Sequence, residues 1–261
     1  MRIRRVSGRE RKGDRSRNSI RADVAWACRI LAMEGHGDLT LGHVSAWTAD
    51  GAGVYIKRKG LSLDEVTPDD VVVIDLDGRK VEGQGEVHLE AALHTEVYRH
   101  RPDVGAVVHT HPPYATAFGA VEGRLLFLSH DALLFPDGVA VFEETSDLVT
   151  SAELGRAVAT ALGSCRALIL RNHGVLVVGS DVRWAVMAAV TLERAIRLQA
   201  IARILGPTRP IPESEVAALH ASKYRDEFID EYWAYWLRRL RRTGLAMGMP
   251  APRNRQGLRR A

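Results

Sequence analysis

Apolar and polar positions follow two different periods along the chain. Ile20, Val24, Cys28 and Leu31 recur at the spacing of one helix face, which predicts a helix that begins at Ser19. Similar patterns predict helices over residues 90–100, 152–162, 182–205 and 213–240. Short runs rich in β-branched residues predict strands over residues 54–57, 71–76 and 104–109, and a strand pair or one long strand over 167–178. Because helices and strands alternate, we expect a single α/β domain.

The positive charge of the chain is concentrated at its two ends. The net charge is +4, but residues 1–17 carry +6 and residues 237–261 carry +8, which leaves about −10 on residues 18–236. We therefore expect basic, disordered tails at 1–18 and 241–261 around one domain at 19–240. The tails lack interleaved aromatic residues and any motif that reads bases, so nucleic-acid binding is only a minor alternative.

Composition excludes several other classes of protein. The chain is 46% hydrophobic and 26% charged, which is typical of a globular protein rather than a disordered one. Cys28 and Cys165 lie far apart and outside any CxxC pattern, so neither a disulfide framework nor a thiolate zinc site is indicated. No apolar run approaches the roughly 20 residues of a membrane span, and no apolar segment of a secretory signal follows the Arg-rich start. We expect a cytoplasmic protein.

The segment His109-Thr110-His111 is the first candidate for chemistry. In an extended strand, residues i and i+2 point to the same side, so the two imidazoles share one face. Two neutral nitrogens at that spacing can occupy neighbouring positions on a divalent metal ion. The alternative is a pair of surface or hydrogen-bonded histidines.

Two further segments support a metal site. Arg171-Asn172-His173-Gly174 is a polar interruption in an apolar run, where backbone freedom at Gly174 would let His173 turn into a cleft as a third ligand. The alternative is a solvated histidine in a turn between strands. Glu90 and His94 lie four residues apart on one predicted helix, so a carboxylate could join the histidines as a ligand or a base, or the two could form a solvated pair.

These motifs together resemble the class II aldolase/adducin family. The resemblance covers roughly residues 20–205, and its most specific stretch is EAALHTEVYRHRPDVGAVVHTHPPYATAF, residues 90–118, followed by LILRNHGVLVVG, residues 168–179. LTLGHVSAW from Leu39 and VTPDDVVVIDLDG from Val66 are similar to the earlier strand region of the family. The resemblance implies a three-layer α/β/α fold with a central, mostly antiparallel sheet.

The resemblance also implies a site. His109, His111 and His173 would bind one divalent metal ion per subunit, with zinc as the first expectation and manganese, iron or cobalt as alternatives. Glu90 would be the catalytic acid/base, and His94 would be its structural neighbour on the helix. Family members form tetramers with active sites between subunits, so we expect a homotetramer whose C-terminal aromatic residues help to close a neighbour's site.

Departures from the family pattern bear on the substrate. Sugar-phosphate members have Gly-Asn-x-Ser, Thr-Pro-x-Gly and Ser-Ser where this chain has GHVS from Gly42, KRKG from Lys57 and His88-Leu89. The lost hydroxyls argue against a phosphate monoester, while added cationic and imidazole groups suit a carboxylate. The predicted substrate-binding residues are His43, Lys57, Arg58, Lys59, His88 and Asp131, the last of which aligns with a tyrosine of the aldolases. The alternative for residues 57–59 is a solvated loop.

The function that follows is a metal-dependent carbon–carbon lyase acting through an enolate-type intermediate. Because the phosphate cradle is lost, we favour a decarboxylase of a hydroxy-aromatic or an oxo/hydroxy acid, as in non-phosphate members of the family. One alternative is an aldolase that cleaves a hydroxy-acid or sugar-type aldol. Another is a non-catalytic, adducin-like binding protein, although such a scaffold is expected to lose the histidines and Glu90, which this chain retains.

Overall fold

The computed structural model describes the backbone of residues 8–251 and the side chains of residues 19–251. Its centre is one eight-stranded sheet with the order β4-β3-β2-β1-β5-β8-β7-β6. Neighbouring strands are antiparallel except β6 and β7, which are parallel. The strands are β1 (His43–Trp47), β2 (Val54–Lys57), β3 (Val71–Ile74), β4 (Lys80–Glu82), β5 (Ala106–Thr110), β6 (Ala140–Phe142), β7 (Ala167–Leu170) and β8 (Gly174–Gly179).

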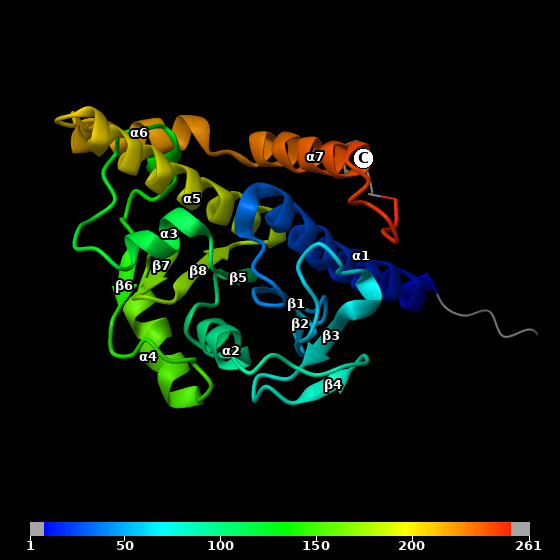
Figure 1. Cartoon of the computed structure of the whole chain (residues 1–261). Helices are drawn as coiled ribbons and strands as arrows, with labels where there is room; N and C mark the ends of the chain where they lie inside the picture. Colours follow the sequence, from blue (N-terminus) through cyan, green and yellow to red (C-terminus); the bar gives the residue numbers. More distant parts are fainter. Residues whose placement is uncertain (1–7, 252–261) are drawn as a thin grey trace, which may run out of the picture.

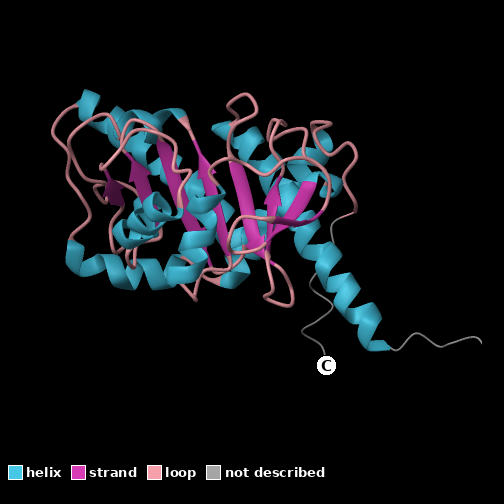
Figure 2. Cartoon of the chain, turned by 90° about the horizontal axis from the view of Figure 1, so that it is seen from below, coloured by secondary structure: helices cyan, strands magenta, loops and turns pink. Residues whose placement is uncertain are grey.

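Helices cover both faces of this sheet. The long helices α1, α5 and α7 lie on one side, and α2 and α4 pack together on the other (Figures 1 and 2). The α-helices are α1 (Gly8–Leu31), α2 (Ala91–His100), α3 (Pro113–Phe118), α4 (Ala152–Leu162), α5 (Val182–Leu205), α6 (Glu213–Lys223) and α7 (Asp226–Arg242). Short helical turns are η1 (Ala32–His36), η2 (Pro68–Asp70) and η3 (Asp131–Leu134).

The inner strands β2, β3, β5, β7 and β8 are buried along their whole length because helices cover each face, whereas the edge strand β4 is exposed. In β2, Tyr55 belongs to the core under α1, α5 and α7, whereas Val54 and Ile56 belong to the core under α2 and α4. This alternation follows from the period of two along a strand. The predicted three-layer α/β/α fold with a mostly antiparallel sheet is therefore confirmed, as are the predicted helices at α4 and α5.

The ends of the chain differ from the prediction. Helix α1 begins at Gly8, well before the predicted start at Ser19, and the predicted helix over 213–240 is two helices with a break at Tyr224 and Arg225. The predicted tail at 241–261 begins inside α7, and Leu245 then packs on the core. The rest of the predicted tails, 1–7 and 252–261, lies outside the described residues.

Strand pairing decides where the candidate site residues meet. β5 lies between β1 and β8, and its register places His109 opposite His43 on one side and opposite Leu176 on the other. The chain reverses between β7 and β8 over three residues that include His173. Glu90 is the residue before the first turn of α2, which covers the same part of the sheet. Residues from four separate segments therefore meet at the end of β5.

Candidate active site

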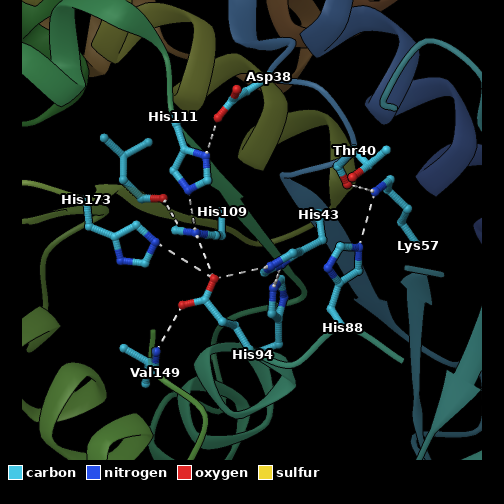
Figure 3. Close-up of polar contacts among 12 residues, drawn as sticks. Asp38, Thr40, His43, Lys57, His88, His94, His109, His111, Val149 and His173 are labelled. Atoms are coloured by element: carbon cyan, nitrogen blue, oxygen red, sulfur yellow. Dashed lines mark hydrogen bonds and ion pairs between the residues drawn. The ribbon is translucent and has the colours of Figure 1, made fainter. Parts of the chain in front are cut away.

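Three histidines converge at the end of β5 (Figure 3). The ring centres of His109 and His111 are 4.8 Å apart, those of His109 and His173 are 5.0 Å apart, and those of His111 and His173 are 5.2 Å apart. One nitrogen from each ring lies within 4.8 Å of the other two, so the three can serve together as metal ligands. The structure thus brings together the three residues that the sequence predicts.

The turn that carries His173 differs from the expected one. Asn172 adopts the left-handed conformation, with φ 57°, whereas Gly174 does not. Gly174 is needed for space instead, because a Cβ there would lie 2.4 Å from Cδ2 of His111 and 2.7 Å from the carbonyl oxygen of Thr110. The absence of a side chain at Gly174 therefore lets His111 approach the turn of His173.

Hydrogen bonds at the outer nitrogens orient two of the rings. Nδ1 of His109 lies 3.0 Å from the carbonyl oxygen of Val175, and Nδ1 of His111 lies 3.0 Å from Oδ2 of Asp38. Both partners accept, so both Nδ1 atoms donate, and a neutral ring then has its lone pair on Nε2. These two Nε2 atoms face each other at 3.1 Å. Two lone pairs at that distance repel unless positive charge lies between them.

Glu90 adds negative charge to the same point. Its Oε2 lies 3.5 Å from Nε2 of His109 and 3.8 Å from Nε2 of His173, while Oε1 accepts a 3.0 Å hydrogen bond from the amide of Val149. Burial by itself raises the pKa of Glu90, but contacts with His109 and then the Val149 amide lower it to about 2. An ionised carboxylate and converging imidazole nitrogens form a donor set that fits a divalent cation.

The other wall of the site contains His43, His88 and Lys57. Nε2 of His43 is 4.0 Å from Oε2 of Glu90, and the His43 and His88 ring centres are 4.4 Å apart. Nζ of Lys57 donates to the carbonyl oxygen of Thr40 at 3.1 Å and to Nε2 of His88 at 3.2 Å. Lys57 is fully buried, and no carboxylate of the described residues lies within ion-pair distance of it.

Burial controls the protonation of this wall. Burial lowers the pKa of Lys57 to about 8 and that of His88 to about 3, and the charge of Lys57 further lowers the pKa of His88. Burial also holds the pKa of His43 well below its ordinary value. At neutral pH this wall therefore presents one buried cation and two neutral imidazoles.

The other predicted substrate-binding residues, Arg58, Lys59 and Asp131, do not join this group but form ion pairs of their own. Arg58 pairs with Asp70 at 2.9 Å, and Lys59 pairs with Glu86 at 3.5 Å. Asp131 pairs with Arg194 on α5 at 3.2 Å. Of the three adjacent cations at 57–59, only Lys57 is buried, because it is the last residue of β2, whereas Arg58 and Lys59 follow the strand and pair with carboxylates nearer the surface.

Sequence reasoning missed the groups that orient the site. Asp38 accepts from His111, and the Val149 amide donates to Glu90, yet both come from loops remote in sequence. Asp38 follows the turn after the first helix, where an acidic residue is commonplace, and a backbone amide has no sequence signal at all. Tertiary structure alone reveals them.

This chain is similar to known proteins in both sequence and fold. The family model described as the class II aldolase and adducin N-terminal domain matches residues 22–200. A 3,4-dihydroxyphthalate decarboxylase from Arthrobacter keyseri is 31% identical over 214 residues, which is 76% of this chain and 85% of that protein. An aldolase II superfamily protein from Pseudomonas syringae superimposes with a TM-score of 0.79 at 26% identity, over 92% of this chain and 96% of that one.

Another relative is longer than the region it shares with this chain. A protein from Streptomyces roseochromogenus subsp. oscitans, named 4-hydroxy-3-prenylphenylpyruvate oxygenase/4-hydroxy-3-prenylbenzoate synthase, is 36% identical over 156 residues, 59% of this chain. The match spans 56% of that relative, little more than half its length. Sugar-phosphate aldolases also occur among the relatives.

The chain belongs to the class II aldolase and adducin family. The family model covers the whole region that contains the candidate site, from α1 to most of α5. Within the described residues, no helix is both long and apolar enough to cross a membrane.

Proposed function

We propose that this protein is a divalent-metal-dependent carbon–carbon lyase, and specifically a decarboxylase of a non-phosphorylated hydroxy-aromatic or oxo/hydroxy acid. One observation carries the proposal: His109, His111 and His173 converge on a point that the ionised carboxylate of Glu90 also faces. His109, His111 and His173 would hold the metal ion, and zinc is our first choice over manganese, iron and cobalt.

A divalent ion in this position would act as a Lewis acid on substrate oxygens and so favour an enolate-type intermediate. Glu90 is ionised at neutral pH, so it first accepts the proton of a substrate hydroxyl. The bond to the carboxylate carbon then breaks, carbon dioxide leaves, and the electron pair remains on the substrate carbon. Glu90 returns its proton to that carbon, and water reprotonates the oxygen. A proton thus replaces the carboxylate on that carbon.

The buried ammonium of Lys57 supports a carboxylate as the substrate group. Its hydrogen-bond partners, Thr40 and His88, are neutral, so an anion entering the site would neutralise an otherwise unpaired charge. The sugar-phosphate members have two hydroxyl residues before the catalytic glutamate, whereas this chain has His88 and Leu89 there. The relative that decarboxylates dihydroxyphthalate, a dicarboxylate, agrees with this choice.

The direct test is release of carbon dioxide. Protein loaded with zinc, and separately with manganese, is mixed with 3,4-dihydroxyphthalate and with hydroxybenzoates, and carbon dioxide is measured. We expect release that stops when a chelator removes the metal and that is absent in His111→Ala. Release that persists without metal contradicts the proposal.

An aldolase is the second candidate, because sugar-phosphate aldolases are among the relatives. The same metal ligands and Glu90 would stabilise an enolate formed by cleavage of an aldol. If the loaded protein releases no carbon dioxide but produces an aldehyde or a keto acid from a hydroxy-acid aldol, this candidate replaces the decarboxylase.

We also propose a homotetramer with active sites at subunit interfaces. The α7 helix buries Trp233 and Trp236 against its own core but leaves Tyr232 and Tyr235 more than two-fifths exposed. These two tyrosines are the part of the aromatic C-terminal stretch that remains available to a neighbouring subunit.

A further inference from the structure

A row of buried hydrogen bonds runs away from the site behind His43. Nδ1 of His43 lies 2.6 Å from Nε2 of His94, and Nδ1 of His94 lies 2.6 Å from Oγ of Ser45. Oγ of Ser45 lies 2.9 Å from the hydroxyl oxygen of Tyr98. All four residues are at least 97% buried. Figure 3 shows the inner end of this row, where His94 lies beside His43.

The Tyr98 end of the row determines which atom donates in each hydrogen bond. Burial raises the pKa of Tyr98, so the phenol keeps its proton and needs an acceptor for it. Ser45 is the only side chain among residues 19–251 within hydrogen-bond distance of that hydroxyl. The Tyr98 hydroxyl therefore donates to Oγ of Ser45.

The donor at Tyr98 then fixes the positions of the protons on Ser45, His94 and His43. Among the described residues, Oγ of Ser45 has only Tyr98 and His94 as hydrogen-bond partners, so once Tyr98 donates to it, its own proton can only go to Nδ1 of His94. A neutral imidazole carries one N–H, so His94 has its proton on Nε2 and donates it to Nδ1 of His43. His43 then carries its proton on Nε2. The opposite order would leave the buried Tyr98 hydroxyl without an acceptor, which is unfavourable for a buried donor.

The Nε2–H group of His43 faces the site and has no hydrogen-bond acceptor within the part of the chain that the structure describes. The nearest carboxylate oxygen, Oε2 of Glu90, is 4.0 Å away, which is too far for a hydrogen bond. His43, Glu90 and His109 also form a second group of three that could hold a metal ion. A nitrogen that carries a proton has no lone pair to give to a metal, so the row of hydrogen bonds excludes His43 as a ligand.

We propose that His43 is a catalytic hydrogen-bond donor, whose Nε2–H binds the substrate oxygen on which negative charge develops as the carbon–carbon bond breaks. His94, Ser45 and Tyr98 are positioning residues that hold His43 in this tautomer. The inference rests on the proposed lyase function. Donors aimed at a developing oxyanion, in a site that needs no reorganisation, commonly contribute a factor of about 10²–10³ in rate.

The tautomer is measured first, independently of activity. Zinc-loaded protein labelled with ¹⁵N-histidine is studied by NMR, and the signals of His43 are assigned by their loss in His43→Gln. We expect a single form with the proton on Nε2 in the wild type. In Tyr98→Phe, both orders of protons become allowed, and we expect a second tautomer. Tyr55→Phe, which removes a hydroxyl from a buried tyrosine of the opposite core, should not alter the His43 signals. A wild-type His43 with its proton on Nδ1 overturns the inference.

Kinetics and metal analysis then test the role of His43 as a hydrogen-bond donor. We expect kcat for decarboxylation to fall about 10²–10³-fold in His43→Leu and less in His43→Gln, whose amide can still donate. For Tyr98→Phe we expect a fall of about 10-fold, with KM and zinc content unchanged. Loss of zinc in both His43 variants would show that His43 is a ligand, and wild-type kcat in His43→Leu would show that it is not a donor; either result overturns the inference.

Failure of the proposed function can be distinguished from failure of this inference. If the loaded protein cleaves no carboxylate or aldol, binding of benzohydroxamate, whose oxyanion mimics an enolate, replaces the rate measurement. We then expect His43→Leu to bind this compound at least about 10-fold more weakly than the wild type, because a hydrogen bond to a charged oxygen is lost. Equal affinity overturns the inference.

Discussion

His109 and His111 define the proposed metal site at the level of single atoms, because their Nδ1 hydrogen bonds turn both Nε2 atoms to one point. We predict that His111→Ala reduces bound zinc from one ion per chain to a small fraction, while circular dichroism remains that of the wild type. The fold survives because two apolar cores, not the metal, hold the sheet. His220→Ala on α6 is the control and should retain zinc; equal zinc in both variants contradicts the assignment.

Glu90 is the only carboxylate among the described residues within 4.0 Å of both His109 and His173. We predict that Glu90→Gln lowers kcat by about 10²–10⁴, which is the usual contribution of a positioned acid/base. The amide preserves the shape, so zinc content should persist. Unchanged turnover would refute the proton-transfer role, and lost zinc would make Glu90 chiefly a ligand.

The pKa of Lys57 predicts how substrate binding depends on pH. Burial lowers its pKa to about 8, so the ammonium is charged below that pH and neutral above it. We expect KM for a dicarboxylate to rise as pH increases through about 8. In Lys57→Met, KM should be about 10–100-fold higher at pH 7 and should lose this dependence, because a charged hydrogen bond is absent at every pH. Lys59→Met, which removes an exposed cation, serves as the control.

Among the elements, the contact between α2 and α4 places Glu90. Gly155 of α4 packs on α2 so closely that an added Cβ would lie 2.7 Å from the carbonyl oxygen of Ala92 and 2.9 Å from Cγ of Glu96. Gly155→Ala would stabilise an isolated helix, but here we predict a loss of about 1–3 kcal/mol in unfolding free energy, since the helices must separate. Urea denaturation measures it, with Thr160→Ala on the exposed face of α4 as the control. A gain in stability would contradict the packing argument.

Elements with a regular pattern between clear flanking residues were predictable, and the three-residue strands were not. The helix α5 and the strand β2 have the predicted bounds, since each has an unbroken period and clear flanking residues. The break between α6 and α7 was missed because Tyr224 and Arg225 interrupt no apolar period. Short strands such as β4 and β6 have three residues each, too few to establish a period, and they form only because a neighbouring strand supplies hydrogen bonds.

At the level of the whole molecule, the proposed tetramer is the main prediction. Tyr232 and Tyr235 leave apolar surface on α7 after Trp233 and Trp236 are buried. We predict that light scattering at micromolar concentration gives about four times the chain mass of 28.8 kDa. Replacing both tyrosines by serine should lower this mass without changing circular dichroism. A monomer mass for the wild type would exclude the assembly.

The sequence by itself determined the family and the α/β class, and it indicated His109, His111 and His173 as a group, because these depend on local periods and on motifs with characteristic spacing. It also indicated Glu90, through its match to the catalytic glutamate of the family, and His43, Lys57 and His88, through their differences from the sugar-phosphate pattern.

Tertiary structure decided which of these residues meet and in what state. Only the strand register shows that His43 lies opposite His109, and only burial shows that Lys57 enters the site while Arg58 and Lys59 pair at the surface. The tautomers of His109, His111 and His43 depend on Val175, Asp38 and His94, which are remote from them in sequence. A hydrogen bond is set by position in space, and the sequence lists residues without their distances.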